Sequence, residues 1–314
     1  MKKTLIIITI VALVAVFGYG IGSSQFVDSA TQTSTSKQVT TTKIVQSTTK
    51  KATKKKKKKK VVKKIVKKKV KFKKKWKYGK YSKIHSGKSV LYKHTWGKNR
   101  KVVAVNAGHG TSGGERYKTL CHPDGSRKLV SGSTKAGAKY SPSITGGTSL
   151  KGKSEAAATL SQAKRLKEQL LKAGFDVLMI RPGKHVQLDN IARTVMANKY
   201  ADCHIAIHYD SSSSNKGAFF LSVPNNKHYR NMEPVKSHWK QHNKFGRSVI
   251  WGIKKNGQRV AGSGSMAMDL TQTSFSTIPS IDLEVGDKAT NTSKKAQIKM
   301  AKAITKGIKK YFKK

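Results

Sequence analysis

Acidic residues are nearly absent from the first third of this chain, and their absence decides which part of the chain can fold. Asp28 is the only Asp or Glu before Glu115, and lysine fills about two thirds of the positions between residues 50 and 80. Like charges at this density repel one another and oppose a compact structure. We therefore expect residues 25–99 to form a disordered Ser/Thr- and Lys-rich linker and residues 100–314 to form one folded domain.

The N-terminal segment, residues 1–24, has the pattern of an export signal. Lys2 and Lys3 precede a continuous apolar run, and small residues follow it around Gly20. The run approaches the roughly 20 residues that span a bilayer, so the segment is either a cleaved signal peptide or an uncleaved membrane anchor. Both alternatives predict an exported protein of the cell wall or extracellular space that contacts a membrane only through this segment.

The net charge of +52 implies a polyanionic partner, since an ordinary cytoplasmic enzyme does not carry such an imbalance. The first arginine is Arg100, so the lysine tract before it offers single ammonium charges without the forked guanidinium group. We expect this tract to bind polyphosphate chains without sequence readout, and we predict no specific nucleic-acid partner. A linker that only keeps the chain solvated is the alternative.

From Val102 onward, short β-branched runs alternate with amphipathic segments. Residues 154–172 repeat apolar side chains at helical spacing, with Ser154 as N-cap and Gly174 just beyond the end. The expected strands cover 102–107, 175–180, 203–208, 219–223 and 277–285, and the expected helices cover 154–172, 188–197, 235–255 and 293–312. This alternation is typical of an α/β fold with a mostly parallel sheet and helices on both faces. In such sheets, functional sites lie at the carboxyl ends of the strands.

The two cysteines, Cys121 and Cys203, are too few for a disulfide-stapled mini-domain or for a zinc site built on four thiolates. The sequence leaves open whether they pair or remain free thiols. The roughly 210 residues after the linker are enough to bury an ordinary core.

The stretch after the first expected strand, residues 106–114, matches two glycine motifs and contains His109. The G-x-G-x-x-G and G-x-S-x-G patterns both need a helix that starts at the motif, whereas a polar loop of about forty residues follows here. We therefore reject a dinucleotide site and a nucleophile elbow. What remains is His109 itself, an imidazole at a strand end between glycines that let a ligand or metal approach.

A second histidine, His208, occupies the equivalent place at the end of another strand. His204 precedes it by four residues, and on a strand the two lie about 13 Å apart, too far to share one zinc ion with bonds near 2 Å. We therefore expect His204 to be a packed residue and His208 to be the candidate ligand.

Two glutamates stand out among the few acids of the domain. Glu155 begins the helix after the long loop, where its carboxylate either points toward the strand ends or only benefits from the helix dipole. Glu284 lies in a late strand between apolar residues, where a charge must be paired or functional, and Asp282 on the same face is the alternative to it. Two histidines and a glutamate form a three-ligand zinc set with an open fourth position, and a further glutamate can act as general base.

The ordered set of the strand ending in GHG, the helix-initial Glu155, ADCHIAIH and PSIDLEVG resembles the zinc-dependent N-acetylmuramoyl-L-alanine amidases of the amidase-3 family. The stretches FDVLMIRPG and IARTVMANKYAD agree with this family in order, and the resemblance runs from about Val102 to Phe312. It implies that His109, Glu155 and His208 hold one Zn²⁺ per chain and that Glu284 is the catalytic acid or base.

The same resemblance implies a monomeric enzyme that hydrolyses the amide bond between N-acetylmuramic acid and the L-alanine of the peptidoglycan stem peptide. Residues 100–314 would be its catalytic domain. The lysine tract would bind teichoic or lipoteichoic acid in place of a wall-binding repeat, because these polymers are polyphosphates. The chain departs from the family at Tyr209-Asp210, where Ala-Asn is usual, at residues 285–287, and in its longer loop after His109.

Three other functions remain open from the sequence. The chain could be a noncatalytic cationic wall-binding protein on an amidase fold, or a secreted polyanion binder built around the lysine tract. A zinc peptidase that cuts within the stem peptide is the nearest enzymatic rival. Product analysis separates the enzymes, because only an amidase frees the amino terminus of L-alanine.

Overall fold

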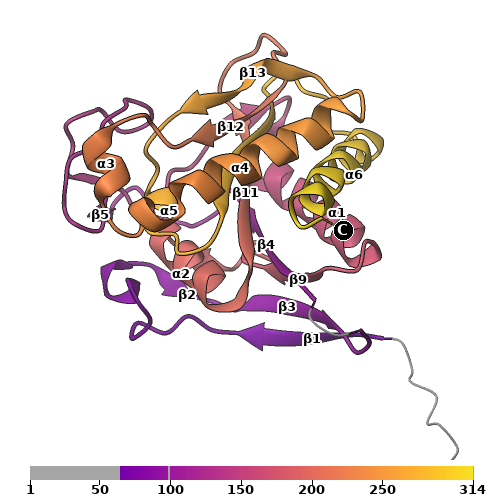
Figure 1. Ribbon diagram of the computed structural model, residues 1–314, viewed down its shortest axis with the longest axis horizontal. Coiled ribbons are helices and arrows are strands. Elements are labelled where there is room, and N and C mark those ends of the chain that lie inside the picture. Colours follow the sequence, from indigo (N-terminus) through magenta and orange to yellow (C-terminus); the bar gives the residue numbers. More distant parts are fainter. Residues whose placement is uncertain (1–63, 98–99, 314) are drawn as a thin grey trace, which may run out of the picture. The chain divides into compact units, whose positions relative to one another are not determined.

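An eight-stranded sheet runs through the part of the chain that the computed structural model describes, residues 64–97 and 100–313 (Figure 1). Its four inner strands are parallel, and the strands that flank this set on either side run antiparallel to it. In order across the sheet, the strands are β1 (Ile65–Val70), β3 (Ser89–His94), β9 (Asp176–Met179), β4 (Val102–Ala107), β11 (Cys203–Asp210), β14 (Ser280–Asp287), β12 (Ala218–Ser222) and β13 (Val260–Ala267).

Helices cover both faces of this sheet. One face packs against α1 (Glu155–Lys172), α4 (Val235–Lys254) and α6 (Lys294–Tyr311), which share a large apolar core with β4, β11 and β14. The other face packs against α2 (Asn190–Tyr200) and the short α5 (Thr271–Ser274). Figure 1 shows α4 and α6 side by side, away from the edge strand β1.

The predicted fold class is confirmed, and each helix and strand expected after residue 102 is present. The N-cap of α1 is Ser154, whose hydroxyl accepts a hydrogen bond from the backbone N–H of Ala157, as the sequence predicts. The sequence did not indicate β13, because its run VAGSGSMA consists mostly of small residues without strand propensity.

The predicted boundary of the disordered linker at residue 99 is wrong. Residues 65–70 form the edge strand β1, which pairs along its length with β3, so the fold includes residues assigned to the linker. The physical reason is that apolar and aromatic side chains interrupt the lysines: Val70 is buried, and Phe72 and Trp76 pack against the core beside α2. Lysine density alone therefore mispredicts this segment.

The expected signal peptide or anchor and the linker up to residue 63 lie outside the described residues. Within the described ranges, every helix is too short or too polar to cross a membrane.

The loop after His109 is not a plain coil but carries two small hairpins, β5 (Lys118–Leu120) with β6 (Tyr140–Pro142) and β7 (Ser149–Leu150) with β8 (Lys153–Ser154). The remaining elements are the 3₁₀ turn η1 (Gly79–Tyr81), the pair β2 (His85–Ser86) and β10 (Gln187–Leu188), and α3 (Lys227–Asn231). Cys121 and Cys203 are both buried free thiols, which settles the question the sequence left open.

Candidate metal centre

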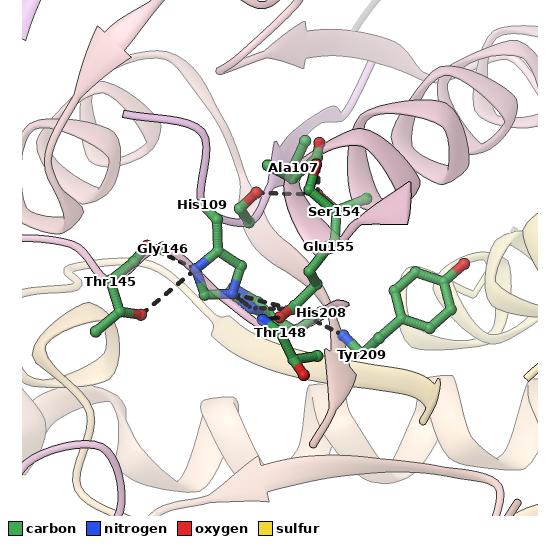
Figure 2. A network of polar contacts seen from close by, with 12 residues as sticks. Ala107, His109, Thr145, Gly146, Thr148, Ser154, Glu155, His208 and Tyr209 are labelled. Atoms are coloured by element: carbon green, nitrogen blue, oxygen red, sulfur yellow. Dashed lines mark hydrogen bonds and ion pairs between the residues drawn. The ribbon is translucent and has the colours of Figure 1, made fainter. Parts of the chain in front are cut away.

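Three side chains from separate segments meet at the carboxyl ends of the central strands. His109 follows β4 by two residues, Glu155 is the first residue of α1, and His208 lies near the end of β11. Figure 2 shows the carboxylate of Glu155 beside both imidazole rings. The sequence named these three residues as candidates, and the structure brings them together as a group that could hold a metal ion.

Glycines allow the two rings to approach. A Cβ atom on Gly108 would lie 2.3 Å from Cε1 of His208, and one on Gly147 would lie 2.7 Å from Cδ2 of His109. Neither position has room for a side chain. His109 itself has a φ of 58°, an uncommon backbone conformation for a residue other than glycine, and such strain clusters at functional sites.

The three potential ligand atoms are mutually close. Nε2 of His109 lies 3.0 Å from Oε1 of Glu155, Nδ1 of His208 lies 3.1 Å from the same oxygen, and the two nitrogens are 3.0 Å apart. In a tetrahedral zinc site with bonds of about 2.0–2.1 Å, neighbouring ligand atoms are separated by about 3.3 Å. The group is therefore nearly the size of one face of such a tetrahedron.

The hydrogen bonds around the group direct the lone pairs of His109 and Glu155 inward. Nδ1 of His109 lies 2.8 Å from the carbonyl oxygen of Thr145, so this nitrogen must donate, and Nε2 of the neutral ring carries a lone pair. The backbone N–H groups of Thr148 and Tyr209 donate to the two oxygens of Glu155 and hold its carboxylate in place. The three inward atoms thus have room for one positive species between them, a proton or a metal ion, and the residues fit zinc.

The carboxylate of Glu155 and the imidazole ring of His208 shift each other's pKa values toward the charged forms. Burial raises the pKa of Glu155, but its hydrogen bonds with His109 and His208 outweigh burial and bring this pKa well below its usual range. Burial lowers the pKa of His208, but the charges of Asp282, Glu155 and Glu284 outweigh it and raise this pKa to about 9. The site therefore attracts positive charge strongly.

Two further carboxylates lie beside the group on one face of β14. Glu284 is in register with His208, and Oδ2 of Asp282 is 3.6 Å from Nε2 of His208. Each keeps one buried oxygen, Oε2 of Glu284 and Oδ1 of Asp282, without a hydrogen-bond partner among the described residues. Burial is the main cause that raises the pKa of both groups, and the Glu284 carboxyl is raised further by Asp282 and Glu155. A carboxylate with a raised pKa is suited to exchange protons near neutral pH.

Buried arginines that the sequence analysis missed hold the strand-end loop in place. Arg193 donates to the carbonyl oxygen of His109 at 2.7 Å, and Arg181 donates to that of Gly108 at 2.8 Å. Burial lowers the pKa of Arg193 to about 9 and that of Arg181 to about 10. The available signal was an arginine in the middle of an otherwise apolar helix, IARTVMA, where a charge needs a partner.

His204 lies away from the metal group, as expected of a packed residue. It is fully buried, its Nδ1 is 3.2 Å from Oγ of Ser280, and burial lowers its pKa to about 3. It is therefore neutral at physiological pH.

The metal group opens into a cleft of about 1010 Å³. The loop after His109 lines the cleft through residues 130–134, and Met266 and Met268 line it as well. Glu284 and Asp282 also line the cleft, so a ligand bound there would reach both carboxylates and the metal group.

An α/β sheet with two histidines and a carboxylate at neighbouring strand ends, beside an open cleft, has the layout of a metal-dependent hydrolase. The family model of the N-acetylmuramoyl-L-alanine amidases, amidase-3, matches residues 103–310. The chain belongs to this family, and the resemblance found in the sequence motifs is confirmed at this level.

Solved structures agree with this fold. The N-acetylmuramyl-L-alanine amidase Ami1 from Mycobacterium smegmatis superposes with a TM-score of 0.56 at 17% identity, over 68% of this chain and 97% of that one. The apo form of Ami1 from Mycobacterium abscessus gives a TM-score of 0.53 at 20% identity, over 68% of this chain and 98% of that one. A comparison with curated protein sequences gives no match.

Proposed function

We propose that this protein is a zinc-dependent amidase that hydrolyses the bond between N-acetylmuramic acid and the L-alanine of the stem peptide in peptidoglycan. One observation carries the proposal: three inward-directed ligand atoms, on His109, Glu155 and His208, lie 3.0–3.1 Å apart at the floor of an open cleft. Family membership supplies the substrate class.

The three residues would hold one Zn²⁺ per chain and leave its fourth position open toward the cleft. A zinc ion bound there would polarise the amide carbonyl and lower the pKa of the attacking water. The carbonyl of Thr145 keeps the proton of His109 on Nδ1, so that Nε2 faces the ion. The backbone N–H groups of Thr148 and Tyr209 fix both oxygens of Glu155.

Glu284 would accept the proton of the attacking water and return it to the amine of the leaving L-alanine. Its place in register with His208 puts its carboxylate beside the metal group, where it also forms a second possible ligand group with His208 and Asp282. As the general base it would stay outside the three-ligand set. Its raised pKa suits both steps, because the same group must gain and then release a proton. Asp282 is the second candidate for this role, since it also lines the cleft and also keeps one buried oxygen without a hydrogen-bond partner among the described residues.

The deciding experiment measures zinc content and the products released from soluble muropeptides by the full chain, by Glu284→Gln and by Asp282→Asn. We expect about one zinc per chain and new L-alanine amino termini from the unmodified protein. Glu284→Gln should keep its zinc and lose about 10²–10⁴-fold in rate, as loss of a general base does. A larger loss in Asp282→Asn would transfer the role to that residue.

The products also decide between this proposal and its rivals. Cleavage within the stem peptide, without L-alanine amino termini, would identify a zinc peptidase. Zinc-free protein without cleavage would leave a noncatalytic wall-binding protein on an amidase fold.

The proposed site of action is the cell wall, outside the cytoplasm, where a monomer would be held by anionic wall polymers. The lysine tract supports this part, because teichoic and lipoteichoic acids are polyphosphates that exchange small counterions for lysine ammonium groups. Fractionation of cells that express the full chain, before and after chemical removal of wall polyphosphate, tests it. Retention that does not change after removal would contradict this part of the proposal.

A further inference from the structure

The folded end of the lysine tract differs from an ordinary solvated linker. Between residues 64 and 83 the chain has no acidic residue and carries eleven lysines, all exposed, which we name the lysine edge: Lys64, Lys67, Lys68, Lys69, Lys71, Lys73, Lys74, Lys75, Lys77, Lys80 and Lys83. The segment comprises β1, at the outer edge of the sheet, and the turn that follows it (Figure 1).

Aromatic side chains fix this segment to the domain while its lysines remain in solvent. Trp76 packs edge-to-face on Tyr200 of α2, with ring centroids 5.6 Å apart. Tyr78 and Tyr81 both pack on Phe275, at 5.5 and 5.8 Å. Backbone N–H groups close the turn, for example from Gly79 to the carbonyl oxygen of Trp76 at 2.7 Å. The lysines are therefore held on an ordered backbone.

The lysine edge has no internal counter-charge within the described part of the chain. None of its ammonium groups forms an ion pair there, although Lys67, Lys77 and Lys80 lie over tyrosine rings. The nearby acids have other partners: Asp176 pairs with His94, and Asp189 accepts from the hydroxyl of Ser82 and from two backbone N–H groups. Within the described residues, no ion pair therefore offsets the repulsion among these lysines.

Protection of an edge strand does not account for this arrangement. Charged residues on an edge strand prevent pairing with other chains, but only Lys67, Lys68 and Lys69 lie on β1 itself. Seven of the eleven follow β1, in the turn from Lys71 to Lys83, where no free strand edge needs protection.

We infer that the lysine edge is a preformed binding surface for a linear phosphodiester polymer of the cell wall, which would hold the catalytic domain itself against the wall. The inference rests on the proposed action in the cell wall and names the part of the molecule that makes the contact. Ammonium groups bind phosphate as point charges, and the tract before Arg100 offers no guanidinium fork for base recognition. The ordered backbone reduces the conformational entropy lost on binding, compared with a disordered tract.

The test compares three variants of the full chain, each with five lysines changed to glutamine. The first removes Lys71, Lys73, Lys74, Lys75 and Lys77 of the lysine edge. The second, a matched control on α6, removes the exposed Lys294, Lys295, Lys299, Lys302 and Lys306. The third removes five lysines among residues 54–60. Binding to poly(glycerol phosphate) is measured over a series of salt concentrations, beside double-stranded DNA of equal total charge.

We expect the first variant to lose at least about tenfold in affinity and its salt slope to fall by up to about 3.5, at about 0.7 per phosphate contact. The α6 variant and the 54–60 variant should each keep their affinity for the polymer within about threefold. Both still have the complete lysine edge, whose phosphate contacts would supply most of the salt-dependent binding free energy. Equal losses in the first variant and the α6 variant would show unspecific charge attraction and overturn the inference. If the 54–60 variant lost the most affinity, the inference would be overturned too, because the binding residues would then lie N-terminal to the lysine edge. Stronger binding to DNA would show that the partner class is wrong.

Hydrolysis of soluble muropeptides separates this inference from the proposed function. The lysine edge lies outside the cleft lining, so all three variants should hydrolyse them at the rate of the unmodified chain. Loss of polymer binding with normal hydrolysis supports the inference. If the unmodified chain did not hydrolyse muropeptides, the proposed amidase activity would be contradicted. The polymer-binding measurements would still test the lysine edge by themselves.

Discussion

Two buried histidine–carboxylate clusters in this domain look alike and differ in what they can hold. In the candidate metal centre, Nε2 of His109 lies 3.0 Å from Glu155. In the second cluster, which holds the long loop, Nε2 of His122 lies 2.9 Å from Asp269. The difference lies at the other ring nitrogen. Nδ1 of His109 faces a carbonyl oxygen and must donate, whereas Nδ1 of His122 faces the hydroxyl of Ser126, which can donate or accept.

The loop cluster can therefore satisfy all of its hydrogen bonds with its own protons. His122 can carry its proton on Nε2, toward Asp269, while the backbone N–H groups of Leu129 and Val130 donate to the same carboxylate. Lys128 completes the set with a bond to the carbonyl oxygen of Asp269 at 2.6 Å. The outer hydrogen bonds thus separate a histidine–carboxylate pair that holds the loop from a pair that could hold a metal ion.

The largest expected effect separates the two clusters by zinc content. His109→Ala should lower zinc from about one to below about 0.1 per chain and abolish hydrolysis, because two remaining ligands do not make a structural or catalytic zinc site. The matched variant His122→Ala should keep its zinc, since none of its atoms belongs to the metal group. Metal analysis of both purified variants checks this. Zinc retained in the first or lost from a folded second variant would contradict the assignment.

The next effect concerns stability, and here the loop cluster should matter more than the candidate metal centre. Asp269→Ala leaves buried N–H groups and the ammonium group of Lys128 without their carboxylate, which should lower the free energy of unfolding by about 3–5 kcal/mol. Urea denaturation of the metal-free variant and of the unmodified chain measures the difference. A loss below about 1 kcal/mol would mean that water replaces the carboxylate and that the cluster does not fasten the loop.

The sequence indicated the members of the candidate metal centre, but it did not indicate those of the loop cluster. His109, Glu155 and His208 each occupy the end or start of a recognisable element, and parallel strands bring such ends together. His122 and Asp269 are 147 residues apart in irregular segments, where no periodicity indicates a neighbour. The proton positions were also beyond the sequence, because they depend on the carbonyl of Thr145, 36 residues from His109.

The same contrast explains the wrong linker boundary. Helices and strands after Val102 follow from apolar periodicity, which the sequence displays directly. The prediction for the segment before Val102 used its average charge. Whether this segment folds depends instead on a few side chains, above all Val70 and Trp76, which pack against distant elements. Average charge therefore predicts disorder well only where such side chains are missing.

The smallest expected effect is a pH dependence that only the metal centre should show. In the metal-free protein the pKa of His208 is raised to about 9, above the value of about 6.5 in an unfolded chain. Its contribution is fully present below pH 6.5 and is lost as pH rises through 9, so stability should fall by up to about 3 kcal/mol over this window. Asp269 has a lowered pKa, so its contribution is lost only in acid.

Urea denaturation with a chelator at pH 6.5 and 9 checks this. The slope should become smaller in His208→Gln, where only the raised pKa values of Asp282 and Glu284 contribute, and it should persist in His122→Ala. Equal stability of the unmodified chain at both pH values would contradict the charge balance of the candidate metal centre.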